Sequence, residues 1–121
     1  MQLSSTEWKI MHALWQRSPA TAREILGAVD EETHWAYTTV RTLLARLVEK
    51  GAVAEHKQAN TSIYEPILAR EDARKDAVQS LLDRVFDGTA GSLVQHLIRE
   101  RKLSKKDRAA LARMLEEDSA R

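Results

Sequence analysis

Apolar side chains recur every three or four residues in three stretches of the first half of the chain, which is the spacing of amphipathic helices. The sequence Ser-Ser-Thr-Glu at 4–7 has the form of a capping box, so we expect the first helix to begin there and to end near Arg17. A second capping pattern, Thr-Ala-Arg-Glu at 21–24, predicts a helix that ends near Val29. The acidic stretch that follows, residues 30–33, is typical of a solvated turn.

The third predicted helix spans residues 36–50, with Gly51 in the position after its last turn. Its apolar residues follow the pattern i, i+3, i+4, i+7, i+8, which is a complete core-facing stripe. The residues expected to face the core from the three helices are Trp8, Met11, Leu14, Trp15, Ile25, Leu26, Val29, Val40, Leu43, Leu44, Leu47 and Val48.

Two short strands are predicted next, at 52–56 and 62–66, with β-branched or aromatic residues at alternate positions. The polar residues 57–61 connect them, and Asn60 suits a positive φ in this turn. Pro66 closes the second strand, where a missing N–H does least harm. Three helices followed by a β-hairpin is the element order of a winged helix-turn-helix, so we expect a mainly α fold with a small hairpin.

The chain beyond the hairpin is predicted to be helical, with a break at Asp87-Gly88 and a last helix that Ser104 caps. We therefore divide it into a winged-helix domain, 1–68, and a helical domain, 69–121. The apolar residues of the second domain either fold back on the first or pair with a second copy. We favour a two-fold homodimer, because the winged helix has enough apolar residues to close its own core. The expected interface residues are Val78, Leu81, Leu82, Val85, Phe86, Leu93, Val94, Leu97, Ile98, Leu111, Met114 and Leu115.

Composition narrows the possible functions. The chain has 121 residues and no cysteine, and its four histidines lack any ligand-like spacing, so we expect no metal, no cofactor and no catalytic site. It has no apolar run of membrane-spanning length and does not start like a signal peptide, so we expect a cytoplasmic protein. The net charge is only +1, from 19 basic and 18 acidic residues. A nucleic-acid-binding protein is usually more basic, because phosphate neutralisation dominates its affinity.

The polar face of the third helix is nevertheless typical of a helix that enters the major groove of DNA. Thr38, Arg41 and Thr42 fall opposite the apolar stripe, and Thr39 flanks them. Arginine can form two hydrogen bonds with guanine, and threonine can contact the methyl group of thymine. A merely solvated face is the alternative, but three threonines are poor helix formers for that purpose. We therefore predict base contacts by these four residues.

Residues around this helix are candidates for the DNA backbone. Thr21 and the N–H groups of the next turn, which starts at Ala22, could bind phosphate, although simple capping explains them too. Tyr37 is either a backbone contact or, together with the threonine face, the docking surface of a protein-interaction module. Four residues near the hairpin tip fit a phosphate contact and an ordinary solvated turn equally well: Lys57, Asn60, Thr61 and Ser62.

Five pieces of the sequence resemble the BlaI/MecI family of penicillinase repressors: LSSTEWKIMHALW, SPATAREI, WAYTTVRTLLARLVEKG, IYEP and FDGTAGSLVQHLI. They occur in order and span almost the whole chain. The resemblance implies a homodimeric transcriptional repressor with an N-terminal winged helix and a C-terminal dimerisation region. Such proteins bind a palindromic operator built around TACA and TGTA and silence antibiotic-resistance genes. Carried over by position, the base contacts again fall on the third helix, and Arg46 becomes a phosphate contact.

The resemblance also implies release of the operator by proteolysis. A membrane sensor-protease would signal the presence of a β-lactam, and the repressor would be cleaved between His96 and Leu97. Family members commonly carry Asn-Phe at that bond and lysine in place of Thr38, so this chain departs from the pattern at both places. The competing hypothesis is a winged-helix protein-interaction module without sequence-specific DNA binding.

Overall fold

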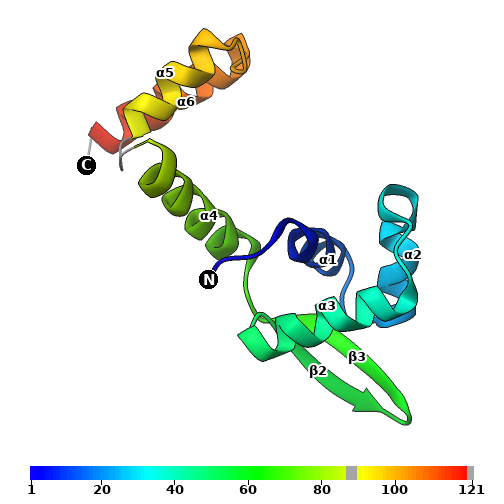
Figure 1. Cartoon of the computed structure of the whole chain (residues 1–121). Helices are drawn as coiled ribbons and strands as arrows, with labels where there is room; N and C mark the ends of the chain where they lie inside the picture. The colour runs from blue at the N-terminus through cyan, green and yellow to red at the C-terminus, as the bar shows by residue number, and fades with distance from the viewer. Residues whose placement is uncertain (87–89, 120–121) are drawn as a thin grey trace. The chain divides into compact units, whose positions relative to one another are not determined.

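The computed structural model describes residues 1–86 and 90–119, and it forms two compact units, 1–77 and 78–121 (Figure 1). The elements of the first unit are α1 (Ser5–Gln16), β1 (Ala20–Thr21), α2 (Ala22–Thr33), α3 (Tyr37–Lys50), β2 (Val53–Gln58) and β3 (Thr61–Pro66). Helix α4 (Arg70–Val85) begins in the first unit and continues into the second, which also holds α5 (Ala90–Arg99) and α6 (Lys105–Ser119). A mainly helical fold with a small antiparallel sheet is thus confirmed.

Helices α1 and α2 both start with the predicted capping boxes. In α1 the Ser4 hydroxyl accepts from the Glu7 N–H at 3.2 Å, and the Glu7 carboxylate accepts from the Ser4 N–H at 2.8 Å. In α2, Thr21 and Glu24 exchange the same two bonds at 3.2 and 3.0 Å. These bonds satisfy backbone donors that the first turn of a helix leaves without partners.

The predicted end of α2 near Val29 is wrong, because the acidic residues 30–33 are helical. The Thr33 hydroxyl donates to the Val29 carbonyl at 2.9 Å, and Glu32 pairs with Lys9 of α1. The helix ends instead at Thr33, and the capping residue His34 adopts a left-handed conformation with a φ of 52°. The helix therefore continues beyond the point at which its apolar residues stop, and its last turn carries a bond within the helix and an ion pair to α1.

Helix α3 has the predicted bounds and supplies the largest part of the core. Gly51 ends it in a left-handed conformation, with a φ of 85°, and its N–H donates to the Val48 carbonyl at 3.0 Å. Four members of the predicted stripe are buried: Val40, Leu43, Leu44 and Leu47. The side chains that pack around them include Ile10, Met11, Leu14, Ile25, Val53 and Tyr64.

The sheet has three antiparallel strands in the order β1-β3-β2, so it contains one strand that the sequence analysis missed. Strand β1 has two residues, and it pairs Ala20 with Tyr64 and Thr21 with Ile63. Strands β2 and β3 also run closer to the tip than predicted, because their last pair is Gln58 with Thr61.

The turn of the hairpin therefore has two residues, Ala59 and Asn60. Ala59 has the positive φ, 57°, so the prediction of a positive φ at Asn60 is wrong. The pairing register of β2 with β3 fixes which residue must take the left-handed conformation, and the residue type does not.

Helix α6 has the predicted start. The Asp107 N–H donates to the Ser104 hydroxyl at 3.1 Å, which is the predicted cap of α6. Helix α5 is amphipathic but buries no residue, since Leu93, Val94 and Leu97 are half-buried and Ile98 is 43% exposed. The predicted break at Asp87-Gly88 lies outside the described residues. The structure also does not describe the side chains of four predicted interface residues: Val85, Leu111, Met114 and Leu115.

Helix length and the placement of metal-binding side chains bear on the possible functions of the described residues. Among residues 1–86 and 90–119, no helix is long and apolar enough to span a membrane. All four histidines are exposed, at positions 12, 34, 56 and 96. Over the same residues, His, Asp and Glu side chains form no group of three or more that could hold a metal ion.

A buried carboxylate joins the start of α1 to the end of α3. Glu7 is only 3% exposed, and its Oε1 accepts from the Lys50 ammonium at 2.6 Å. Burial raises the pKa of Glu7, but hydrogen bonds from Lys50 and Ser4 outweigh it, so the pKa is lower than its ordinary value. The Lys50 ammonium also donates to the Gln2 carbonyl at 3.0 Å and so holds the N-terminal segment against α3.

We expect Lys50→Met to lower the free energy of unfolding at neutral pH by about 1–3 kcal/mol, because it leaves a buried carboxylate without its cation. This is less than a fully buried pair would cost, since the Lys50 side chain is 39% exposed and solvent screens its charge. The measurement is urea unfolding followed by circular dichroism. The matched control is Lys57→Met, which removes an exposed lysine at the hairpin tip and should have little effect.

The stabilities of wild type and Lys50→Met should depend differently on pH. The lowered pKa of Glu7 means that the pair stabilises the fold at neutral pH and that this contribution is lost as the pH falls through that pKa. The stability difference between wild type and Lys50→Met should therefore shrink in acid. A difference that stays constant down to pH 3 would contradict the assignment to Glu7.

Candidate nucleic-acid interface

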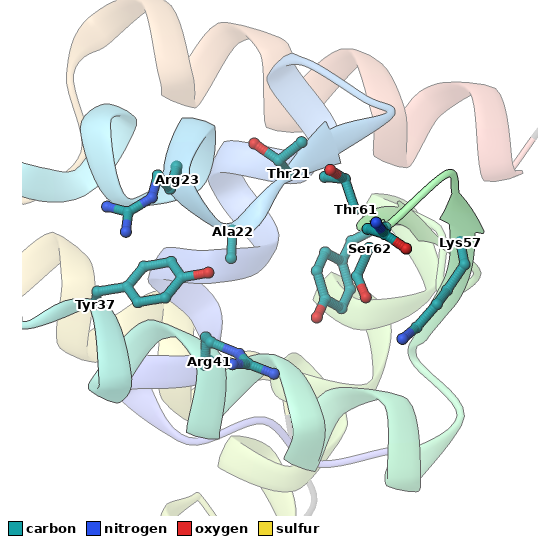
Figure 2. Close-up of a pocket in the computed structure, with 10 residues that line it drawn as sticks. Thr21, Ala22, Arg23, Tyr37, Arg41, Lys57, Thr61 and Ser62 are labelled. Carbon is teal, nitrogen blue, oxygen red and sulfur yellow. The ribbon is translucent and has the colours of Figure 1, made fainter.

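The first turns of α3, the start of α2 and the hairpin tip surround one polar pocket with a volume of 370 Å³ (Figure 2). Its lining comes from all three elements: Thr21, Ala22, Arg23, Tyr37, Arg41, Lys57, Asn60, Thr61, Ser62 and Tyr64. Figure 2 shows Arg23 and Tyr37 on one side of it and Lys57, Thr61 and Ser62 on the other. All but Arg23 and Tyr64 were predicted from the sequence as DNA contacts.

Strand β1 explains why α2 and the hairpin meet at this pocket. Thr21 is at once the last residue of β1, paired with Ile63 of β3, and the N-cap of α2. Its strand neighbour Ala20 pairs with Tyr64, and both are buried. Two residue pairs thus hold the start of α2 beside the hairpin.

Tyr64 forms part of the pocket and was missed as a site residue. It is 5% exposed, and its hydroxyl donates to the Glu55 carboxylate at 3.4 Å. Burial and the negative charge of Glu55 raise the pKa of Tyr64 above its ordinary value. The phenol therefore stays protonated and acts as a hydrogen-bond donor within the wall of the pocket. The alternating pattern of β3 had indicated only that Tyr64 is a strand residue.

Arg23 was also missed, and it lies against an aromatic ring. Its guanidinium carbon is 4.3 Å from the centroid of the Tyr37 ring, which is the distance of a cation–π contact. Arg23 is the second residue of α2, where the positive end of the helix dipole disfavours a cation. That unfavourable placement was visible in the sequence and could have drawn attention to this arginine.

The pocket concentrates positive charge. Arg23, Arg41 and Lys57 line it, and in the described part of the chain none of the three has a carboxylate oxygen within 4.0 Å. Acidic residues outside the pocket are paired with other cations, for example Glu7 with Lys50, and Glu24 with Arg17 at 3.3 Å. The near-neutral net charge of the chain therefore does not describe this face.

The start of α3 differs from the starts of α1 and α2. Its N-cap is Ala36, which offers no side-chain hydrogen bond, and its first turn contains no acidic residue. An uncapped N-terminus presents backbone N–H groups and a positive partial charge, and both favour an anion.

The remaining predicted contacts lie outside the pocket. Thr38, Thr39 and Thr42 are exposed on α3, and the Thr42 hydroxyl donates to the Thr38 carbonyl at 2.9 Å. Arg46 is also exposed, but it lines a separate pocket with Glu7, Lys50 and neighbouring residues. The structure thus groups Arg41 with the hairpin and α2, and it places Arg46 on another side of α3.

The predicted cleavage bond lies inside α5. His96 is exposed and Leu97 half-buried, and the His96 ring is 6.0 Å from the ring of Phe86 between centroids. Both residues belong to the unit 78–121.

Comparison with known proteins gives matches along nearly the whole chain. The model of the penicillinase repressor family matches residues 3–117. The penicillinase repressor of Bacillus licheniformis is 29% identical over 120 residues, which are 99% of this chain and 94% of that protein. The methicillin resistance regulatory protein MecI of Staphylococcus aureus strain N315 is 26% identical over 114 residues, or 94% and 93% of the two chains.

Two solved structures resemble part of the chain. The solution structure of the DNA-binding domain of the repressor BlaI has a TM-score of 0.53 and 30% sequence identity, and the match covers 59% of this chain and 87% of that one. The monomeric form of Bacillus licheniformis BlaI, in complex with the blaP half-operator, has a TM-score of 0.52 and 29% identity, with coverage of 60% and 88%.

Proposed function

The chain belongs to the penicillinase repressor family, and on that basis we propose that it is a dimeric transcriptional repressor that binds a palindromic operator through α3. The family is one of transcriptional repressors and not of enzymes. One of its members, BlaI, has been solved in complex with a half-operator. The observation that carries the proposal is the group of unneutralised cations where α3, the start of α2 and the hairpin tip meet.

We assign base contacts to the exposed polar face of α3, namely Thr38, Thr39, Arg41 and Thr42. All four lie in the first two turns, and the N-terminal turns of a recognition helix lie deepest in the major groove. Arg41 has no competing carboxylate among the described residues, so its guanidinium is available for a guanine edge.

We assign backbone contacts to residues that line the same pocket from α2 and the hairpin: Thr21, Ala22, Lys57, Asn60, Thr61 and Ser62. Arg46 is a separate phosphate contact, about 7–8 Å further along the axis of α3 than Arg41 and turned away from it. The competing hypothesis is a protein-interaction module, in which the Tyr37 ring, which has Arg23 on one face, would dock a partner chain.

The helical C-terminal domain, 69–121, is proposed to bring two winged helices, 1–68, to one operator built around TACA and TGTA. Pairing two copies raises the effective concentration of the second winged helix at the operator, so a dimer binds more tightly than one copy. The incompletely buried apolar face of α5 supports a second copy as its partner.

Control is proposed to act on this pairing. Cleavage between His96 and Leu97, triggered by a membrane sensor-protease, would cut α5 and separate the two copies. The regulated genes would serve β-lactam resistance or a related response, and the protein would act in the cytoplasm, where operator DNA lies. His96 is exposed, as a cleavage site requires, although a protease must first unwind the helix that contains it.

Arg41→Ala tests the groove assignment. We expect it to weaken binding to a TACA/TGTA duplex by about 1–3 kcal/mol and to relax the preference at one base pair, because a bidentate contact is lost. Fluorescence anisotropy on duplexes with each base pair changed in turn measures both effects. Arg74→Ala is the control, since it removes an exposed arginine of α4 that lies outside the pocket. If the two variants bind with equal affinity and selectivity, the groove assignment is wrong.

Ile98→Asp tests the dimer. A charge on the apolar face of α5 should raise the dimer dissociation constant at least about tenfold, since its burial against a second copy is unfavourable. Operator affinity should fall in parallel. Arg99→Asp places the same side chain at an exposed position on the side of α5 opposite its apolar residues and should leave the dimer intact. Sedimentation velocity reports the association, and a tight Ile98→Asp dimer would refute this role of α5.

A further inference from the structure

Arg23 occupies a place that is electrostatically unfavourable in the free protein. It lies in the first turn of α2, close to the positive end of the helix dipole, and it shares the pocket with Arg41 and Lys57. Among the described residues, no carboxylate lies within 4.0 Å of it. Three cations around one polar pocket repel one another, and an anion that enters the pocket removes that repulsion.

Tyr37 is what holds Arg23 in this position. The half-buried tyrosine is the first residue of α3, and its ring centroid lies 4.3 Å from the guanidinium carbon (Figure 2). A guanidinium that lies over a ring uses one flat face for that contact. Its N–H donors point outward in its own plane, so they remain free to form a fork toward two oxygens of one phosphate.

The element that carries Arg23 indicates which part of DNA it meets. In a winged helix the helix before the recognition helix crosses the backbone, while the recognition helix enters the groove. Arg23 is on α2, whereas Arg41 is on α3. The expected partner of Arg23 is therefore a phosphate, which carries no sequence information.

We infer that Arg23 is a phosphate-binding residue of the operator complex and that Tyr37 is the positioning residue that holds its guanidinium toward the backbone. This inference rests on the proposed function. It also changes the role of Tyr37, which the sequence indicated as a direct contact with the backbone or with a protein partner.

Binding of the full-length Arg23→Ala protein to operator and to scrambled duplexes tests the first part. We expect affinity to fall about 3- to 10-fold on both duplexes by the same factor. The slope of the logarithm of the binding constant against the logarithm of the salt concentration should become shallower by about 0.9, which corresponds to one phosphate. Arg17→Ala is the control, because Arg17 is exposed outside the pocket and already paired with Glu24.

Substitutions of Tyr37 test the positioning role. Tyr37→Phe keeps the ring and should bind within about twofold of wild type, whereas Tyr37→Leu should lose most of what Arg23→Ala loses. In the double variant, Arg23→Ala with Tyr37→Leu, binding should be no weaker than in Arg23→Ala alone. Thermal melting of each variant identifies any that fails to fold. If Tyr37→Leu fails to fold, Tyr37→Phe still tests the role of the ring, because it keeps the ring and removes only the hydroxyl.

Contradictory results separate the inference from the proposed function. If Arg23→Ala keeps full affinity and the full salt slope while Arg41→Ala loses affinity, the inference is wrong and the proposed function stands. If Tyr37→Leu weakens binding equally with and without Arg23, Tyr37 contacts DNA itself and does not position the arginine. If neither arginine variant differs from wild type, the proposed function itself is wrong.

Discussion

The pairing of β1 with β3 is the constraint on which the rest of the candidate site depends. It consists of two residue pairs, Ala20 with Tyr64 and Thr21 with Ile63, yet it joins the start of α2 to the hairpin. Because Thr21 is also the N-cap of α2, the direction of that helix is tied to the edge of the sheet. The buried apolar residues of α3 pack in the same core as those of α2 and the hairpin, and the pocket forms where α2, α3 and the hairpin meet.

The arrangement of charge matters more than its sum. Two carboxylates close in sequence to pocket residues have partners other than the pocket cations: Glu24 caps α2 and pairs with Arg17, and Glu55 accepts from the Tyr64 hydroxyl. The acidic residues 30–32 lie at the other end of α2. A protein with a net charge of +1 can therefore present a positive surface to DNA, provided that its fold keeps the two kinds of charge apart.

The first turns of α4 belong to the same compact unit as the winged helix. The Trp15 indole N–H donates to the Leu68 carbonyl at 2.9 Å, and the guanidinium of Arg70 lies 5.7 Å from the Trp15 ring. Ala73 of α4 is 1% exposed. The first turns of α4 thus pack on the winged helix, and the compact unit extends to residue 77, whereas the functional boundary after residue 68 remains a proposal. Helix α4 runs without a break from Arg70 to Val85.

Features that depend on residues close together in the chain could be predicted from the sequence. The capping boxes of α1 and α2, the glycine that ends α3 and its apolar stripe involve contacts within one or two helical turns, so residue type and spacing suffice to predict them. For the same reason Arg41 and the hairpin tip could be proposed as site residues. Four features became visible only in the folded chain: the end of α2, the turn at Ala59, strand β1 and the contact of Arg23 with Tyr37. Each of these depends on a register or a distance between segments that are separate in sequence, and the free energy of such contacts is not encoded in the local pattern of either segment.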